Sequence, residues 1–314
     1  MKELTAALRE TARRLLAAGE VAAVLGWEKG SRRYLTPPTV VTRPEEADRL
    51  VYDEFAANSP TVYLTDWRDK AGRVAVCVKG CDSRGVVRLL QDNQIDRKRL
   101  VVIGLPCAGK LDRKAARVGR VDEPQLLAKC RQCTYPNPVL ADIVLGGVEV
   151  TREAKGPTGA AAEEPTAAVV GSEAAGRFDR VAELAALTPG ERRAFWQGHE
   201  ERCLRCYACR AVCPACSCRE CIFDSDRAGW VGRYVSPATN AFYLTTRAMH
   251  AAGRCVECGE CERVCPAGLP LMLLNRLVIK ELAKKYVTLA AGLDPDVPSP
   301  LGRFRLNDGD GDEP

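Results

Sequence analysis

The stretch CLRCYACRAVCPACSCREC, residues 203–221, holds seven cysteines in nineteen positions. A second stretch, CVECGECERVCP at residues 255–266, repeats the first half of that pattern. Clustered thiols are metal ligands or redox groups in a reducing compartment, and structural disulfides in an oxidising one. The cellular compartment therefore decides whether these cysteines are metal ligands or disulfide partners.

Composition and the N-terminus indicate the cytoplasm. The chain has 314 residues, 16 cysteines, 46% hydrophobic residues and a net charge of +5, so it can bury a core without disulfides. The segment MKELTAALRETARRLL lacks the apolar stretch of a signal peptide. The most apolar late segment, residues 269–282, is broken by polar and charged residues, so no membrane span is expected. The positive charge is modest and dispersed, which argues against nucleic-acid binding.

Each stretch contains a four-cysteine run with the spacing of bacterial ferredoxins, C-x2-C-x2-C-x3-C-P. In that spacing three thiolates bind three corners of a 4Fe–4S cluster, and the fourth cysteine reaches the other cluster. The sequence therefore predicts two clusters with exchanged fourth ligands. The first is assigned Cys203, Cys206, Cys209 and Cys265, and the second is assigned Cys255, Cys258, Cys261 and Cys213.

Helical patterns flank both runs. Thr188 begins one such pattern as a capping residue, residues 238–252 form another, and apolar residues recur at helical spacing after Cys265. Clusters framed by helices resemble those of the α-helical ferredoxin domains in heterodisulfide reductase and succinate dehydrogenase subunits. This resemblance implies an α-helical dicluster ferredoxin-like domain in the C-terminal half.

The N-terminal half contains a predicted strand–helix–strand unit. Residues 73–78 (RVAVCV) and 100–105 (LVVIGL) have the apolar character of buried strands, with a helical pattern between them. Such a unit implies parallel strands, so we predict an α/β domain with a parallel sheet. Ligands of such sheets bind beyond the carboxyl ends of the strands, where Cys81 and Cys107 lie.

A third set of thiols can converge at that edge, because Cys130 and Cys133 form a C-x2-C pair of the metal-binding type. The phrases VKGCDSRGVVRLLQDNQI, VVIGLPCAGKLD and KCRQCTYPNPVLADIVLGG are similar to the β-subunit family of deazaflavin-reducing hydrogenases and formate dehydrogenases, over about residues 70–147. In that family, cysteines at the matching positions surround a 4Fe–4S cluster. The resemblance thus implies a third cluster at Cys81, Cys107, Cys130 and Cys133.

Four thiols remain outside these sets. Cys216, Cys218 and Cys221 complete no known motif, and they are open to three interpretations: ligands of a fourth cluster, exchange partners of the assigned ligands, or bystanders. Cys77 lies within a strand and is predicted to be a core thiol. Members of the resembled family also use a flavin, but no glycine-rich dinucleotide motif is present here, so flavin binding is left open.

The charge around the two ferredoxin-type runs differs. Four arginines, at positions 202, 205, 210 and 219, accompany the first run, whereas Glu257, Glu260 and Glu262 lie in the second. Positive charge favours the reduced cluster, so the first cluster is expected to have the higher potential. The alternative is that these side chains are simply solvated.

These patterns divide the chain into four segments. We expect an α/β domain at residues 1–150 and a flexible linker, rich in Ala, Gly, Glu and Pro, at residues 151–177. A ferredoxin-like domain is expected at residues 178–290, followed by a disordered acidic tail at residues 291–314.

The sequence therefore predicts an electron-relay subunit, without a catalytic site of its own, in a cytoplasmic oxidoreductase complex of the hydrogenase, formate dehydrogenase or heterodisulfide reductase type. Its partners are expected to be the other subunits of that complex. The first alternative is a flavin- or deazaflavin-dependent β-subunit whose catalytic site lies in the α/β domain. The second is a zinc-stapled scaffold, although structural zinc sites usually separate two ligand pairs by a long gap.

Overall fold

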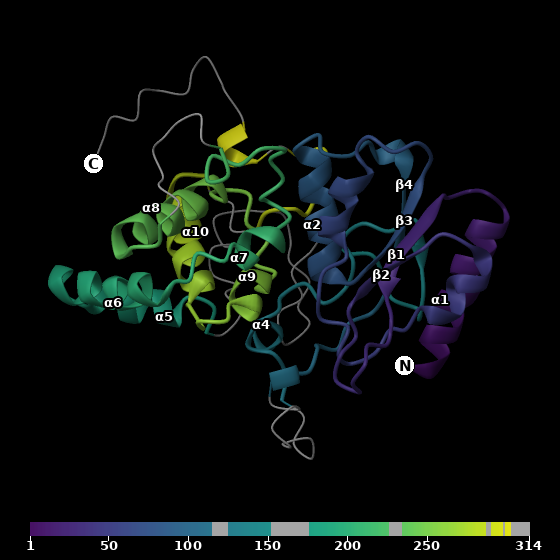
Figure 1. Cartoon of the computed structure of the whole chain (residues 1–314), viewed down its shortest axis with the longest axis horizontal. Helices are drawn as coiled ribbons and strands as arrows, with labels where there is room; N and C mark the ends of the chain where they lie inside the picture. The colour runs from purple at the N-terminus through teal and green to yellow at the C-terminus, as the bar shows by residue number, and fades with distance from the viewer. Residues whose placement is uncertain (115–124, 152–175, 226–233, 287–289, 298, 303–314) are drawn as a thin grey trace.

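The chain folds into an N-terminal half built on a sheet and a C-terminal half built from helices (Figure 1). The structure, a computed structural model, describes residues 1–114, 125–151, 176–225, 234–286, 290–297 and 299–302. The expected linker therefore lies almost entirely outside the described residues. No helix among the described residues is long and apolar enough to cross a lipid bilayer.

The sheet of the N-terminal half has five strands in the order β2-β1-β3-β4-β5. Strands β1, β3, β4 and β5 are parallel neighbours, whereas β2 pairs with β1 in the antiparallel direction, so the sheet is mixed. The predicted strand–helix–strand unit is present as β3, α2 and β4. The bounds are β1 Ala23–Trp27, β2 Pro38–Val41, β3 Val74–Val78, α2 Gly80–Gln91, β4 Leu100–Gly104 and β5 Ile143–Val144.

Both faces of the sheet are covered, which explains why its central strands are continuously apolar. Successive side chains of a strand point to opposite faces. Ala75 and Cys77 therefore join the cluster under helix α1 (Lys2–Ala17). Val76 joins the cluster formed with α2 and the 3-10 helix η2 (Thr61–Trp67). The shorter 3-10 helices η1 (Pro44–Arg49) and η3 (Arg97–Arg99) lie in the connections.

The C-terminal half consists of helices connected by the two cysteine runs. Thr188 caps α6 in a capping box with Glu191, as the sequence predicts, and Ser236 caps α8 in the same way. Phe178 and Val181 pack against α10 in a separate hydrophobic cluster. The helices are α5 Asp179–Ala186, α6 Pro189–Arg202, α7 Ala208–Ala211, α8 Pro237–His250, α9 Glu260–Val264 and α10 Leu271–Tyr286, with the 3-10 helix η5 at Pro300–Gly302.

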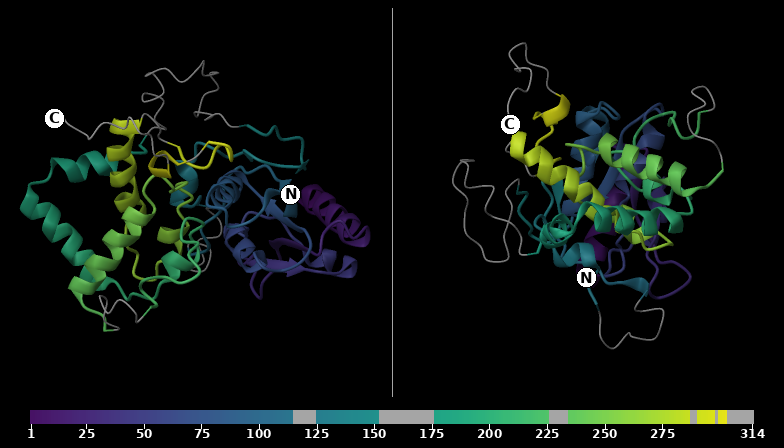
Figure 2. Two further views of the ribbon diagram at one scale, coloured as in Figure 1. Left: turned by 90° about the horizontal axis from the view of Figure 1, so that it is seen from above. Right: turned by 90° about the vertical axis from the view of Figure 1, so that its left-hand side faces the viewer.

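The two halves lie side by side, and Figure 2 shows the N-terminal sheet and helix α1 away from the C-terminal helices. Segments from both halves meet at α2. The Arg84 guanidinium donates to the Ala291 carbonyl at 2.8 and 3.0 Å, and the Gln91 amide donates to the Asp294 carbonyl at 2.7 Å. These contacts differ from the expectation of a disordered tail that begins at residue 291. Residues 303–314 of that expected tail lie outside the described residues.

The start of α2 contains a buried ion pair that we expect to be important for stability. Lys79 Nζ lies 2.6 Å from Asp82 Oδ2, and their side chains are 2% and 1% exposed. Replacing Lys79 with Met leaves the Asp82 carboxylate buried without its partner, which should lower the free energy of unfolding by about 3–5 kcal/mol. Anaerobic thermal denaturation followed by circular dichroism measures the change.

The control for this prediction is Arg13→Met, which removes a pair with Asp48 on the surface. Exposed pairs contribute little because water screens them, so the midpoint of this variant should stay close to that of the unmodified protein. Equal midpoints for the Lys79 and Arg13 variants would contradict the stabilising role of the buried pair.

Candidate metal centres

The two ferredoxin-type runs adopt the same loop. Arg205 and Tyr207 of the first run have φ of 46° and 59°, and Glu257 and Gly259 of the second run have φ of 53° and 66°. These are the third and fifth positions of each run, and a short helix, α7 or α9, follows directly. A left-handed backbone costs a non-glycine residue roughly 1–3 kcal/mol and persists where the surroundings fix it. Its repetition at matching positions indicates that both loops are shaped for the same kind of ligand.

The first predicted set of thiols surrounds one small cavity. The Cys209 thiol lies 3.1 Å from the Tyr243 hydroxyl, and the Leu269 N–H donates to Cys265 Sγ at 3.4 Å. Burial raises the pKa of Cys203, and the thiolates of Cys209 and Cys265 contribute in the same direction. Cys265, the last cysteine of the second run, therefore lies with the first run. The cavity is lined by Cys203, Cys206, Cys209 and Cys265 together with Tyr243 and apolar side chains.

The second predicted set comes together around the thiol of Cys213. Burial is the main cause that raises the pKa of Cys255 to about 12 and that of Cys261 to about 11, and the charge of Cys213 adds to both. Burial and then Cys213 also raise the pKa of Cys258. The Asn275 amide donates to Cys255 Sγ at 3.5 Å. Each run thus contributes its last cysteine to the thiols of the other.

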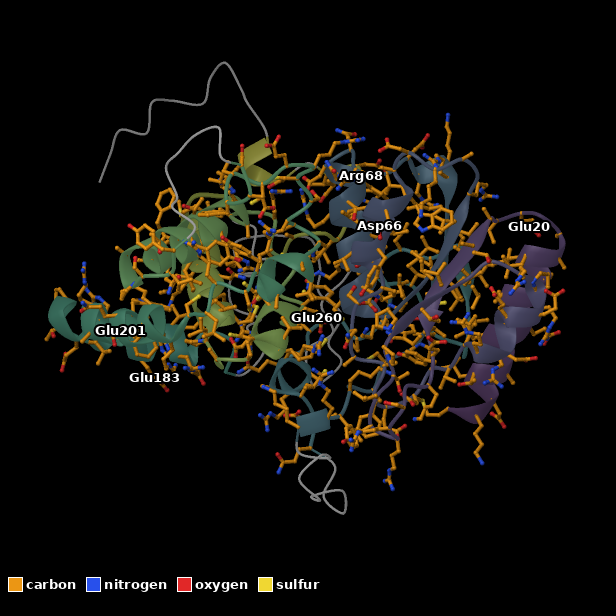
Figure 3. All side chains as sticks on the ribbon, viewed as in Figure 1. Glu20, Asp66, Arg68, Glu183, Glu201 and Glu260 are labelled. Atoms are coloured by element: carbon orange, nitrogen blue, oxygen red, sulfur yellow. The ribbon has the colours of Figure 1, made fainter. Side chains whose placement is uncertain are left out.

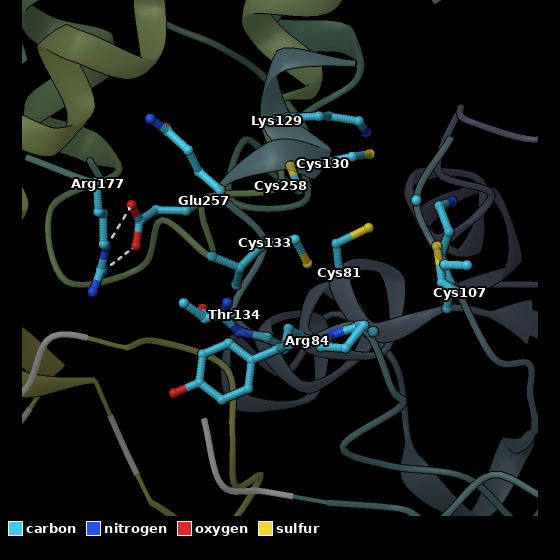
Figure 4. Close-up of a pocket in the computed structure, with 18 of the residues that line it drawn as sticks. Cys81, Arg84, Cys107, Lys129, Cys130, Cys133, Thr134, Arg177, Glu257 and Cys258 are labelled. Atoms are coloured by element: carbon cyan, nitrogen blue, oxygen red, sulfur yellow. Dashed lines mark hydrogen bonds and ion pairs between the residues drawn. The ribbon is translucent and has the colours of Figure 1, made fainter. Parts of the chain in front are cut away.

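The third predicted set lies at the carboxyl edge of the sheet. Cys81 is in the first turn of α2, directly after β3, and Cys107 follows β4, while the short helix α4 (Ala128–Arg131) carries Cys130. The Lys110 N–H donates to Cys130 Sγ at 3.4 Å. All four thiols, Cys81, Cys107, Cys130 and Cys133, line a cavity of about 350 Å³ (Figure 4).

This cavity connects the two halves of the chain. Cys258 of the second run belongs to its lining, as do Val256 and Glu257 from the same loop. Figure 4 shows Cys258 beside Cys130 and Cys133. The third site and the second ferredoxin-type site are therefore direct neighbours, although about 120 residues separate them in sequence.

Buried cations accompany the third set. Lys110 is 2% exposed, and its ammonium donates to the Asp53 carbonyl at 2.8 Å and lies 3.6 Å from the centre of the Tyr52 ring. Burial lowers the pKa of Lys110 to about 8, against the opposing effect of the Cys107 thiolate. Burial also raises the pKa of Cys81, and the Asp82 carboxylate raises it further. A low-dielectric site of this kind suits ligands whose negative charge is shared with a bound metal.

Two glutamates of the second run, Glu257 and Glu260, each have two cationic partners. Glu257 pairs with Arg177 and with Arg276, the latter at 3.0 Å. Glu260, labelled in Figure 3 where the two halves meet, pairs with Arg263 at 2.6 Å and with Lys129. The sequence indicated an acidic second site, because Arg177, Arg276 and Lys129 are distant in sequence from the run and only Arg263 lies within it.

The donor sets fit 4Fe–4S clusters in their chemistry and arrangement. Each set offers four thiols, which is the ligand count and type of a 4Fe–4S cluster. Among the described residues, no group of three or more His, Cys, Asp or Glu side chains is gathered closely enough to hold a single metal ion. The thiols of the first and third sets instead line cavities, as a cluster that binds one thiolate at each of four iron atoms requires.

The remaining thiols take separate positions. Cys216 donates a hydrogen bond to Cys213 and is the main cause that lowers the pKa of Cys213 to about 5. Cys221 lies beside the guanidinium of Arg210, and Cys218 is exposed. Cys77 is fully buried in the core beneath α1, where burial raises its pKa. The position of Cys77 agrees with the predicted core thiol.

Comparison with known proteins places iron–sulfur chemistry in the C-terminal half. Residues 200–269 match the family model of a 4Fe-4S dicluster domain. This match contains both ferredoxin-type runs.

Two curated relatives match most of the chain. One is the F420-dependent formate dehydrogenase subunit beta of Methanocaldococcus jannaschii, with 22% identity over 82% of this chain and 84% of the relative. The other is the F420-dependent formate dehydrogenase 1 subunit beta of Methanococcus maripaludis, with 26% identity over 92% of this chain and 90% of the relative.

A solved structure, the F420-reducing [NiFe] hydrogenase complex from Methanosarcina barkeri, matches 37% of this chain and 44% of its own chain, with 17% identity and a TM-score of 0.30. This likeness is too low to support a structural argument. The sequence relatives and the family model agree with each other. The chain is similar along most of its length to beta subunits of F420-dependent formate dehydrogenases, and it contains a 4Fe-4S dicluster domain in its C-terminal region.

Proposed function

We propose that the chain relays single electrons through three 4Fe–4S clusters as one subunit of an oxidoreductase complex. The observation that carries this proposal is the series of three cysteine sets. The third set shares its cavity with Cys258 of the second set, and Cys213 and Cys265 link the second set to the first. The similarity to formate dehydrogenase beta subunits supports the same function.

Each 4Fe–4S cluster supplies a centre that accepts and releases one electron. The protein's own contribution is to hold the thiolates and to keep water away from them. Cys261 and Cys265 are 5% and 7% exposed, and the Asn275 amide and the Leu269 N–H donate hydrogen bonds to cysteine sulfurs. Such hydrogen bonds and burial set the reduction potential of each site.

The proposed partners are the subunits that supply and remove the electrons. The curated relatives are named as formate dehydrogenase subunits, and this name indicates a redox complex as the class of partner. The cytoplasm is the proposed compartment because clustered cysteines that serve as metal ligands are typical of a reducing environment. We further propose that the C-terminal half is an α-helical ferredoxin-like domain, which agrees with the helices that flank both runs.

A second candidate function is a flavin- or deazaflavin-dependent β-subunit with its own catalytic site. The observation in its favour is a cavity of about 410 Å³ next to the third set. Its lining combines basic side chains, including Lys129, Arg131 and Arg180, with fewer acidic ones. That charge suits an anionic cofactor.

Iron content tests the number of clusters. Three clusters of four iron atoms predict about twelve iron atoms and about twelve sulfides per chain, with little zinc. Anaerobic iron, sulfide and zinc analysis of the purified chain provides the measurement. A value near eight would remove the third site from this account, and a value near sixteen would assign a fourth cluster to the region of Cys216, Cys218 and Cys221.

Cys130→Ser tests whether the third site is a separate centre. Removing one thiolate should abolish one electron paramagnetic resonance signal and about four iron atoms, and should spare the dicluster domain, because Cys130 lies outside both ferredoxin-type sets. The matched control is Cys77→Ala, which changes a core thiol and should retain all the iron. Loss of every cluster from the Cys130 variant alone would show that the three sites do not form independently.

Turnover by the isolated chain separates the two candidate functions. The relay predicts little or no donor-dependent reduction of an artificial dye by the fully loaded chain with pyridine nucleotide, hydrogen or formate, because no donor-binding subunit is present. Absorbance spectra of the same sample detect any bound flavin. Brisk reduction at rates of about 1–10³ per second would overturn the relay and favour the second candidate.

A further inference from the structure

A buried cation lies at each of the two places where neighbouring cysteine sets meet. Lys129 lies between the third set and the second set, and Arg247 lies between the second set and the first. Neither residue belongs to a cysteine motif, and neither is a ligand in the assignments above. Their positions point to a role in setting the charge at the junctions of the relay.

Lys129 lies at the first junction, in the cavity that the third and second sets share. It is in α4 beside Cys130, its side chain is 9% exposed, and it pairs with Glu260 of α9. It lines the same cavity as Cys81 and Cys258. Its cavity position places the ammonium near the thiols of both sets, and Glu260 is its ionic partner.

The backbone holds Lys129 close to the second run. Gly259 has φ of 66°, and a Cβ atom at that position would lie 2.6 Å from the Cβ of Lys129. Tyr207 adopts the same backbone conformation at the matching position of the first run, so it is the close contact with Lys129 that requires glycine at position 259. The absence of a side chain at position 259 therefore allows Lys129 to pack closely against the second run.

Arg247 takes the equivalent place at the second junction. It is 4% exposed in α8, and its Nη2 donates to the Cys209 carbonyl of the first run at 3.2 Å. Its guanidinium is also hydrogen-bonded to the thiol of Cys261 in the second set. Its buried Nε has no hydrogen-bond partner among the described residues. Leaving this buried donor without a hydrogen bond costs free energy. The sulfur atoms of the neighbouring cysteines are the acceptors that lie near it.

We propose that Lys129 and Arg247 are positioning residues of the relay, and that each raises the reduction potential of the two clusters between which it lies. This proposal rests on the three-cluster function proposed above. Reduction adds one electron to a site, and a nearby buried cation stabilises the added negative charge. The second cluster lies beside both cations, so it should depend on both.

The test is a redox titration of the anaerobic, fully loaded chain, followed by electron paramagnetic resonance. Lys129→Met should lower the potentials of the third and second clusters and leave the first unchanged. Arg247→Met should lower the second and first and leave the third unchanged. We expect the ratio of reduced to oxidised cluster to fall about tenfold at a fixed applied potential. For a one-electron couple this corresponds to a decrease of about 59 mV in the reduction potential of the cluster.

Charge-conserving variants separate electrostatics from packing. Lys129→Arg and Arg247→Lys keep the cation and should restore most of the shift, whereas a purely structural role would not follow the charge. Glu260→Gln removes the negative partner of Lys129 and should raise the potentials of the third and second clusters. Lys284→Met removes an exposed cation, paired with Glu281 at 2.8 Å, and should shift none of the clusters.

Iron analysis of each variant keeps this inference distinct from the proposed function. Unmodified protein with about eight iron atoms would refute the third cluster itself. Full iron content with unchanged potentials in both Met variants would overturn the role of Lys129 and Arg247 while leaving the relay intact. If a Met variant loses iron, the charge-altered and charge-conserving variants decide instead. At the Lys129 junction, a raised potential in Glu260→Gln supports the proposal, and an unchanged or lowered potential overturns it. At the Arg247 junction, a retained potential in Arg247→Lys supports the proposal, and a lowered potential overturns it.

Discussion

The structure depends on the burial of many cysteines in a low-dielectric interior, where iron binding would require them as thiolates. A buried negative charge is costly unless it is paired or shared with a metal. Burial raises the pKa of Cys81, Cys255 and Cys258, so the free thiols resist ionisation. Bound iron and buried cations would offset that cost together. This constraint explains why Lys110 and Arg247 are buried close to the cysteine sets.

The same constraint explains how the two halves of the chain meet. The junction is formed by Lys129 from the N-terminal half with Glu260 and Cys258 from the C-terminal half, next to the closely packed Gly259. Further hydrogen bonds at α2 hold the segment after α10 against the sheet domain. An electron path from one half to the other requires this kind of direct contact, because the donor and acceptor sites have to be neighbours. The same contact between the two halves therefore serves both the packing of the chain and the proposed electron path.

Local patterns predicted much of this molecule. The apolar strands, helix α2 and the Thr188 capping box follow from short-range sequence signals, and the structure confirms them. The dicluster domain follows from cysteine spacing, and the family match confirms it. The third cysteine set was inferred from strand ends and family resemblance, and the structure brings its four thiols around one cavity.

Long-range features could not be predicted in this way. The antiparallel strand β2 makes the sheet mixed, and no local pattern specified its partner. The cations that pair with Glu257 and Glu260 come partly from positions distant in sequence, such as Arg177 and Lys129. Counting charges within the second run therefore gave an acidic site, whereas the fold surrounds these glutamates with positive charge. The pairing of these glutamates with distant cations can be recognised only from the folded structure.

The most direct test of three clusters in series is anomalous X-ray scattering at the iron edge from anaerobically grown crystals. The account predicts three separate iron peaks in each molecule, about four atoms in each. The middle peak should lie among Cys255, Cys258, Cys261 and Cys213, with one peak on either side of it at the other two sets. Two peaks confined to the dicluster domain, or a third peak away from Cys81 and Cys130, would contradict it.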